Sequence, residues 1–267
     1  MARIFISYAM EDAKEAAEFH RLLTLLGFTC FLAHKDIRKG EQWREAILRS
    51  IRDADVFIPL LSDHGVTSAW VQQECGMAHV LAEGRKRKPI IIPVVPNGKT
   101  PPGCLSEYQA QLVRVTFWTS KLSLDSAVVT TLGSTIAGQT ASLPEIRPRT
   151  ISNLKGAAVA DICVVLEFLR LVGQLAFNEF LTVIKYTSEH PTAYRSDPVM
   201  THVYALMRDH YEEVQKHPDW LAACNRLHER YQQFKEEERR RQEEFLRKLT
   251  EQSETTDKPA EGDERKR

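Results

Sequence analysis

The sequence predicts a doubly wound α/β domain with a parallel sheet of five strands, followed by an all-helical region. Two observations lead to this prediction. In the N-terminal half, short apolar runs alternate with segments whose apolar residues recur at helical spacing, as in a parallel sheet covered by helices on both faces. Beyond residue 156 the alternation ends, and only helical periodicity remains.

Five apolar runs are expected to form the strands. They span residues 3–8, 28–33, 56–61, 89–95 and 113–117. The third run is continuously apolar, as expected of a strand that is covered on both faces. Helices are expected between the runs and after them, at residues 11–26, 43–51, 68–83 and about 123–137.

The chain is expected to divide into four parts. The α/β domain takes residues 1–138, and residues 139–156 are expected to be a linker because they hold two prolines and several small polar residues. Helical patterns fill residues 157–250, a region expected to oligomerise or to sense a trigger. The last part, residues 251–267, is too polar to order itself and is expected to be a disordered tail.

Composition argues against several classes of function. Lys plus Arg and Asp plus Glu both number 36, so the formal net charge is zero and does not favour binding to nucleic acid or to an anionic membrane. Charged residues such as Asp161 and Arg170 interrupt the most apolar helical stretch, and the N-terminus lacks the pattern of a signal peptide. We therefore expect a cytoplasmic protein without a membrane or nucleic-acid partner.

Cysteine and histidine spacing indicates no metal site. The five cysteines are scattered and lack CxxC spacing, so they are expected to be small buried hydrophobes in a reducing compartment, without disulfides. The nine histidines form no cluster at ligand spacing. The sequence therefore predicts neither a resident metal nor a cofactor.

Glu74 is the candidate functional residue with the clearest physical argument. Ser68 is a good helix N-cap, and on a helix from there Glu74 lies beside Trp70 at the edge of the stripe formed by Val71 and Cys75. An ionised carboxylate there needs a partner, a shifted pKa or a cleft, and catalytic carboxylates are made in the same ways. Helix geometry alone is also compatible with a boundary glutamate exposed to water.

The predicted topology brings three distant segments to one edge of the sheet. In doubly wound sheets the ligand crevice lies outside the carboxyl ends of the strands. That rule selects Ser7 and Tyr8, the loop at residues 34–40, and residues 62–70. Glu74 lies about one helical turn beyond Trp70, so it can point into the same crevice.

Four short motifs, taken together, resemble those of a TIR domain (Toll/interleukin-1 receptor type) of the bacterial kind. They are Phe5-Ile6-Ser7-Tyr8, Asp36-Ile37-Arg38-Lys39-Gly40-Glu41-Gln42-Trp43, Ile58-Pro59-Leu60-Leu61-Ser62 and Ser68-x-Trp70-x-x-x-Glu74. The resemblance covers about residues 2–137 and implies a flavodoxin-like sheet. The chain departs from the family at Val71, where a cysteine is frequent, and at Ala33, where an aspartate often ends the second strand.

The resemblance implies a reaction and a set of site residues. Many bacterial and plant members cleave NAD+, releasing nicotinamide and leaving ADP-ribose or a cyclised form of it, and bacterial members commonly serve in defence against phage. Matched residue by residue, Glu74 would be catalytic, and Tyr8, Lys35, Asp36 and Trp70 would bind the substrate. NAD+ would be a substrate rather than a cofactor, and the protein would be a homo-oligomer through the TIR domain and the C-terminal helices.

Two other functions are compatible with the same fold. In the first, the protein is a non-catalytic adaptor whose TIR domains associate while the helical region recruits partners. In the second, it is a phosphoacceptor receiver domain, for which Glu11, Asp12 and Asp63 are the candidate acidic residues. A receiver would leave the Trp70 to Glu74 pattern without a role.

Overall fold

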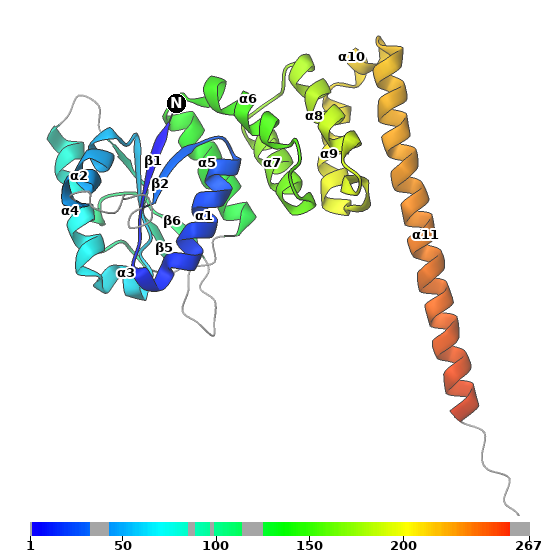
Figure 1. The fold of residues 1–267 in the computed structure, drawn as a ribbon, viewed down its shortest axis with the longest axis horizontal. Coiled ribbons are helices and arrows are strands. Elements are labelled where there is room, and N and C mark those ends of the chain that lie inside the picture. Colours follow the sequence, from blue (N-terminus) through cyan, green and yellow to red (C-terminus); the bar gives the residue numbers. More distant parts are fainter. Residues whose placement is uncertain (1, 33–42, 85–88, 97–98, 114–124, 257–267) are drawn as a thin grey trace, which may run out of the picture.

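The computed structural model describes residues 2–32, 43–84, 89–96, 99–113 and 125–256. Its N-terminal half is a parallel sheet between helices, and its C-terminal half is entirely helical (Figure 1). The predicted fold class is confirmed. Candidate substrate-binding residues Lys35 and Asp36 lie outside the described residues.

The central sheet has the strand order β2-β1-β3-β4, with every pair parallel. Its strands are β1 (Arg3–Ser7), β2 (Thr29–Leu32), β3 (Val56–Pro59) and β4 (Ile90–Ile91). Register places Phe5 opposite both Phe31 and Phe57, and its ring stacks on theirs at centroid distances of 5.3 and 5.5 Å. This aromatic row fixes the alignment of the three strands, because a slip by one residue would turn each ring to the other face.

The expected strand at residues 89–95 is present as two short strands. After β4 the chain continues into β5 (Val94–Pro96), which pairs in parallel with β6 (Gln111–Val113). Pro93 separates them, because a proline has no N–H to donate to the sheet. A bridge between Leu60 and Val94 joins β5 to the end of β3, so five strand positions run side by side as predicted. Of the strand expected at residues 113–117, only the first residue is described.

Helices cover both faces of the sheet. They are α1 (Ala13–Leu25), α2 (Trp43–Asp53), α3 (Asp63–Thr67), α4 (Ala69–Gly84) and α5 (Ser126–Gln139), with short 3-10 turns η1 (Met10–Asp12) and η2 (Gly103–Leu105). Helices α1 and α5 lie on one side, and α2 and α4 on the other (Figure 1). All four residues of β3 are buried between these layers, in agreement with its continuously apolar sequence.

The range expected to be a linker contains a packed helix, α6 (Leu143–Asn153). Pro144 lies in its first turn, where a missing N–H is harmless, so this proline favours the helix instead of a flexible segment. Thr150 Oγ1 donates to the carbonyl of Leu26 at 2.7 Å, and Asn153 Nδ2 donates to that of Leu25 at 2.8 Å. These bonds satisfy carbonyls that the end of α1 leaves free, and they dock α6 on the α/β domain.

Gly27 makes this docking sterically feasible. Its φ of +89° lies in the left-handed region, and a Cβ added to it would stand 2.8 Å from the carbonyl oxygen of Ile146. Only glycine accepts both conditions without strain. Gly27, which follows the end of α1, therefore also allows the backbone of α6 to approach closely.

The remaining helices form a second core. They are α7 (Val159–Leu171), α8 (Phe177–Glu189), α9 (Asp197–Asp209), α10 (Tyr211–Gln215) and α11 (Pro218–Thr256), with the 3-10 turn η3 (Ala193–Arg195). The expected helix at 157–186 is broken after Leu171, where Gly173 has a φ of +103°. Helix α7 also joins the first core through Val164 and Phe168, and its Asp161 pairs with Arg21 of α1 at 3.0 Å. The two halves are thus directly packed together.

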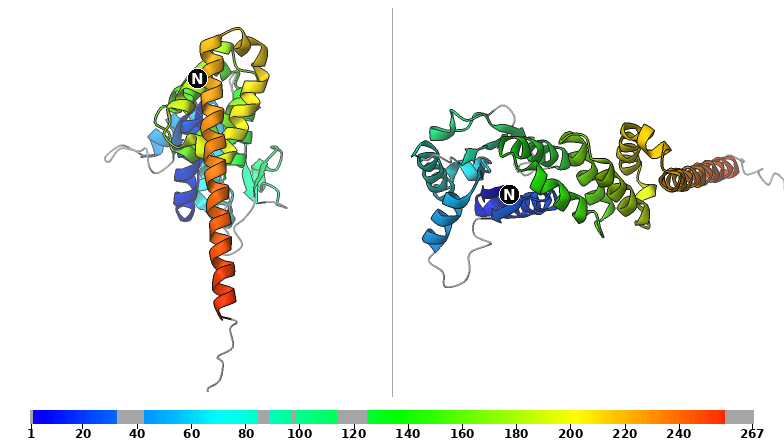
Figure 2. Two further views of the ribbon diagram at one scale, coloured as in Figure 1. Left: turned by 90° about the vertical axis from the view of Figure 1, so that its right-hand side faces the viewer. Right: turned by 90° about the horizontal axis from the view of Figure 1, so that it is seen from above.

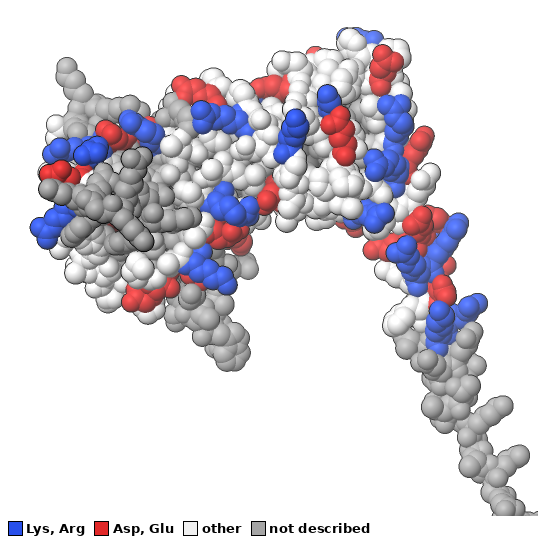
Figure 3. Space-filling model, in the orientation of Figure 1, with Lys and Arg blue, Asp and Glu red and all other residues white. Residues whose placement is uncertain are grey.

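Helix α11 leaves the body of the protein and extends into solvent (Figures 1 and 2). Opposite charges are interleaved along the coloured part of this helix up to Lys248 (Figure 3), where ion pairs one turn apart, such as Arg240–Glu236 and Lys248–Glu244, support an isolated helix. The helix continues to Thr256, into the range expected to be a disordered tail. No helix among the described residues combines the length and apolar character needed to cross a membrane.

Candidate functional site

Glu74 faces the interior of the α/β domain. Helix α4 begins directly after Ser68, whose Oγ accepts a hydrogen bond from Val71 N at 3.4 Å, as an N-cap should. The buried face of the helix includes Glu74 along with Val71 and Cys75, and Glu74 has 0% relative exposure. The alternative of a boundary glutamate exposed to water is therefore wrong. Packing of α4 on the sheet turns Glu74 toward the strand ends.

Ser7 is the hydrogen-bond partner of Glu74. It is the last residue of β1 and is itself fully buried, and its Oγ donates to Glu74 Oε2 at 2.5 Å. Burial removes water from the carboxylate and raises its pKa to about 7, while the hydrogen bond from Ser7 and the nearby Trp70 side chain partly oppose the shift. A glutamate that changes charge near neutral pH at the carboxyl end of a parallel strand is a strong functional candidate.

A second buried carboxyl–hydroxyl pair lies at the neighbouring strand end. Ser62 Oγ donates to Asp12 Oδ2 at 2.5 Å and accepts from the backbone N–H of Gly65 at 2.9 Å, which caps α3. The chain turns so tightly here that a Cβ on Gly65 would lie 2.1 Å from the carbonyl oxygen of Leu60. This pair fixes the turn that leads into α4, and hence the position of Glu74.

The other described candidate residues, Trp70 and Tyr8, lie in different surroundings near Glu74. Trp70 lies half-buried in the first turn of α4, where it packs on the core. Its side chain lowers the pKa of Glu74 and so favours the ionised carboxylate. Tyr8 follows Ser7 directly and is 4% exposed, as part of the hydrophobic core. The structure therefore brings Glu74 and Trp70 together around Ser7, and places Tyr8 as a core residue beside them. The strand-end rule brought Ser7 and Ser62 to the crevice edge, but neither was assigned a role in the site. The bond of Ser62 to Asp12, which lies in η1, was not predicted.

Comparison with known proteins assigns the N-terminal half to a family. Residues 4–128 match the model described as "TIR domain". The α/β unit is a TIR domain. A solved structure of TIR domains, from work titled "Structure of the activated Roq1 resistosome directly recognizing the pathogen effector XopQ", is similar at 14% identity and a TM-score of 0.33, covering 78% of this chain and 99% of that one. The search of curated proteins returned no match.

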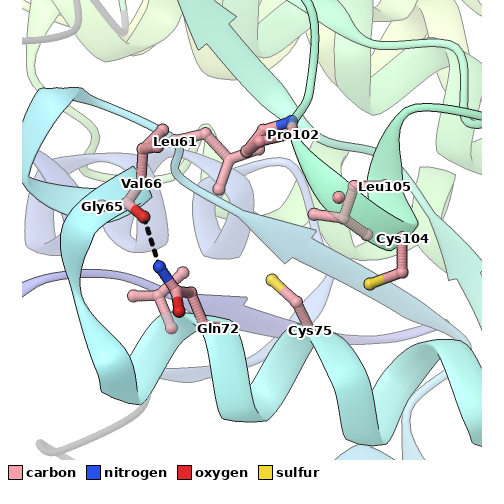
Figure 4. Close-up of a pocket in the computed structure, with 10 residues that line it drawn as sticks. Leu61, Gly65, Val66, Gln72, Cys75, Pro102, Cys104 and Leu105 are labelled. Carbon is pink, nitrogen blue, oxygen red and sulfur yellow. Dashed lines mark hydrogen bonds between the residues drawn. The ribbon is translucent and has the colours of Figure 1, made fainter.

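The TIR domain has a well-formed cavity, but it lies on a different flank of α4 from Glu74. Its volume is about 320 Å³, and it is bordered by α3, α4 and the η2 segment (Figure 4). Val71, Gln72 and Cys75 line it from α4, opposite Cys104 and Leu105 of η2. Cys75 follows Glu74 in the helix and so points about 100° away from it. This cavity is therefore not assigned to the chemistry of Glu74.

The acidic residues of the receiver alternative take separate partners in this TIR domain. Asp63 is exposed and pairs with Lys99, whose hydrogen bond lowers the pKa of Asp63. Asp12 is buried and bonded to Ser62 instead. Glu11 is exposed. The three carboxylates thus do not form one acidic pocket, and the family match removes the basis of the receiver interpretation.

Proposed function

We propose that the TIR domain cleaves NAD+ at the bond between nicotinamide and ribose, with Glu74 as the catalytic carboxylate. The observation that supports this best is the placement of Glu74, buried at the carboxyl end of β1 and hydrogen-bonded to Ser7. The TIR family includes NAD+ glycohydrolases, and the resemblance of the Trp70 to Glu74 motif assigns Glu74 their catalytic position.

The reaction needs stabilisation of positive charge more than proton transfer. As the bond breaks, the ribose becomes electron-poor and resembles an oxocarbenium ion, while nicotinamide departs as a neutral base without a general acid. A carboxylate fixed beside the ribose attracts that charge as it develops. At 4 Å and an effective dielectric constant of about 20, this attraction is about 4 kcal/mol, or roughly a thousandfold in rate.

Ser7 and the remaining candidates serve this carboxylate or hold the substrate. The Ser7 hydroxyl orients Glu74 through their hydrogen bond and favours its ionised form. The indole of Trp70 offers an aromatic face for a nicotinamide or adenine ring. We assign substrate contacts also to Tyr8, Lys35 and Asp36, on the resemblance alone.

Access to Glu74 requires a rearrangement, because the residue has no exposed surface. We propose that association of TIR domains, aided by the helical region at residues 157–250, opens this site in a homo-oligomer. We propose on the same resemblance that the protein acts in bacterial immune signalling against phage. Cleavage would then depend on protein concentration or on a trigger.

The test is incubation of the full chain with NAD+ at a series of protein concentrations, with products separated by chromatography. We expect nicotinamide release that rises more than linearly with protein concentration, and the second product distinguishes ADP-ribose from a cyclic isomer. Glu74→Gln should lower the rate about a thousandfold. Glu45→Gln, an exposed carboxylate on α2 of the same domain, is the matched control and should keep full activity.

Complete enclosure of Glu74 favours one alternative, the non-catalytic adaptor. A scaffold requires a stable TIR domain but no access to Glu74. Association measured by light scattering, together with no nicotinamide release at any protein concentration, would support the adaptor and refute the enzyme. Equal turnover by Glu74→Gln and the parent chain would refute the site assignment.

A further inference from the structure

Three potential metal ligands converge on the outer end of α4, away from Ser7 and Glu74. His79 and Glu83 lie one turn apart on this helix, and Glu107 follows η2. One ligand atom from each of the three lies within 4.8 Å of the other two. Sequence spacing did not indicate this group, because Glu107 comes from a segment that only the fold brings to α4.

The contacts within the group show two carboxylates facing one imidazole. Glu83 Oε1 lies 3.8 Å from His79 Nε2, and Glu107 Oε1 lies 3.3 Å from His79 Nδ1. The His79 side chain is 21% exposed, whereas those of Glu83 and Glu107 are 70% and 60% exposed. The imidazole is therefore held in place, and the two carboxylates are free to adjust around it.

Tyr108 contacts His79 at Nδ1, the same ring nitrogen that Glu107 approaches. Its hydroxyl lies 3.0 Å from His79 Nδ1, and its ring meets the imidazole edge-on at a centroid distance of 6.1 Å. A partner on one ring nitrogen commonly fixes a histidine that binds metal through the other, so Nε2 is the nitrogen left for an ion.

We propose that His79, Glu83 and Glu107 bind a divalent transition-metal ion of the zinc type. One imidazole and two carboxylates are a ligand set of intermediate hardness that suits Zn²⁺ better than Mg²⁺ or Ca²⁺, which prefer oxygen ligands alone. Tetrahedral bonds of about 2.1 Å place ligand atoms about 3.4 Å apart. The ligand atoms now lie within 4.8 Å of one another, and the exposed Glu83 and Glu107 side chains have the freedom to move closer around an ion.

The ion would connect two parts of the TIR domain that the sequence separates. Helix α4 carries Glu74, and the segment with η2 supplies Cys104 and Leu105 to the cavity beside α4 (Figure 4). An ion bound by His79 and Glu83 of α4 and by Glu107 after η2 would hold the η2 segment against the helix.

The experiment titrates chelator-treated full-length protein with Zn²⁺ alone by calorimetry at neutral pH, and with Co²⁺ as a spectroscopic probe. We expect one saturable site for Zn²⁺, a melting temperature that rises with Zn²⁺ concentration, and no comparable effect of Mg²⁺. His79→Ala should abolish binding, and Tyr108→Phe should weaken it about tenfold. His64→Ala, an exposed histidine on neighbouring α3, is the control and should bind normally.

Glu83→Gln and Glu107→Gln are the decisive variants, because both side chains are largely exposed and neither change should impair folding. Together they should reduce affinity at least about tenfold. Unchanged binding in this double variant would overturn the proposal, as would the absence of saturable binding by the parent chain. A strong thiolate-to-cobalt band would place the ion on one of the five free cysteines and overturn it equally.

Discussion

Replacing Glu74 by glutamine is expected to stabilise the fold in a pH-dependent manner. The pKa of this carboxyl is about 7 in the folded protein, against an ordinary value of 4.5. Below pH 4.5 the group is protonated in both states and contributes nothing. As the pH rises, the unfolded chain releases its proton first, so the folded state loses stability until about pH 7, where the loss becomes constant.

The size of this effect follows from the two pKa values. Their difference of about 2.5 units, at 1.36 kcal/mol per unit, means that ionised Glu74 destabilises the folded state by about 3 kcal/mol at pH 8. Glutamine has the same shape, cannot ionise, and its carbonyl can accept the Ser7 hydrogen bond. Glu74→Gln should therefore gain about 3 kcal/mol relative to the parent chain between pH 4 and pH 8.

Urea unfolding followed by circular dichroism, at several pH values from 4 to 8, measures this difference directly. All other titrating groups are shared by the two proteins, so their contributions cancel in the difference between the two free energies of unfolding. A constant cost of burying the glutamine amide shifts this difference equally at every pH and leaves its dependence on pH unchanged. The Glu45→Gln control should give a nearly flat difference. A Glu74→Gln difference that changes by less than about 1 kcal/mol over this range would refute the conclusion that burial dominates at Glu74.

Three further predictions concern neighbouring features. In the parent chain, nicotinamide release should rise with pH around pH 7, as Glu74 ionises. Ser7→Ala removes a hydrogen bond that favours ionised Glu74, so a pH–rate profile of this variant should show the rise about one pH unit higher. Gly65→Ala should destabilise the protein by more than about 2 kcal/mol in denaturant unfolding, because the new Cβ would collide with a backbone carbonyl at 2.1 Å. Thr150→Val keeps the shape but loses the hydrogen bond from α6 to the end of α1, and should cost about 1 kcal/mol by the same measurement; no change would show that the bond does not secure α6.

Local patterns in the sequence were sufficient for the order and type of most elements. The alternation of apolar runs and helical periodicity predicted the parallel sheet, because burial on both faces leaves a continuous apolar signature in strands such as β3. The interleaved charges of residues 235–244 indicate a solvated helix in the same way, since ion pairs one turn apart form within one helix. The rule of strand carboxyl ends selected Ser7 and the region around Trp70 without coordinates.

Helix boundaries and docking needed the tertiary structure. Prolines indicated a linker where α6 forms, because the same residues that interrupt helices also begin them. What secures α6 is its contact with Gly27 and the free carbonyls of α1, and those partners are more than a hundred residues away in sequence. Packing of this kind leaves no periodic signature along the chain.

At the candidate site, too, some features could be predicted from the sequence and others depend on the tertiary structure. From the sequence alone, Glu74 was an edge carboxylate with a motif around it, and the resemblance supplied a reaction. Its burial, its bond to Ser7 and its raised pKa depend on the angle at which α4 packs on the sheet. The group of His79, Glu83 and Glu107 likewise exists only because the fold returns η2 to α4. Sequence determined which side chains are available, and tertiary packing decided which of them meet, because desolvation and coordination depend on distances between segments that are remote in the chain.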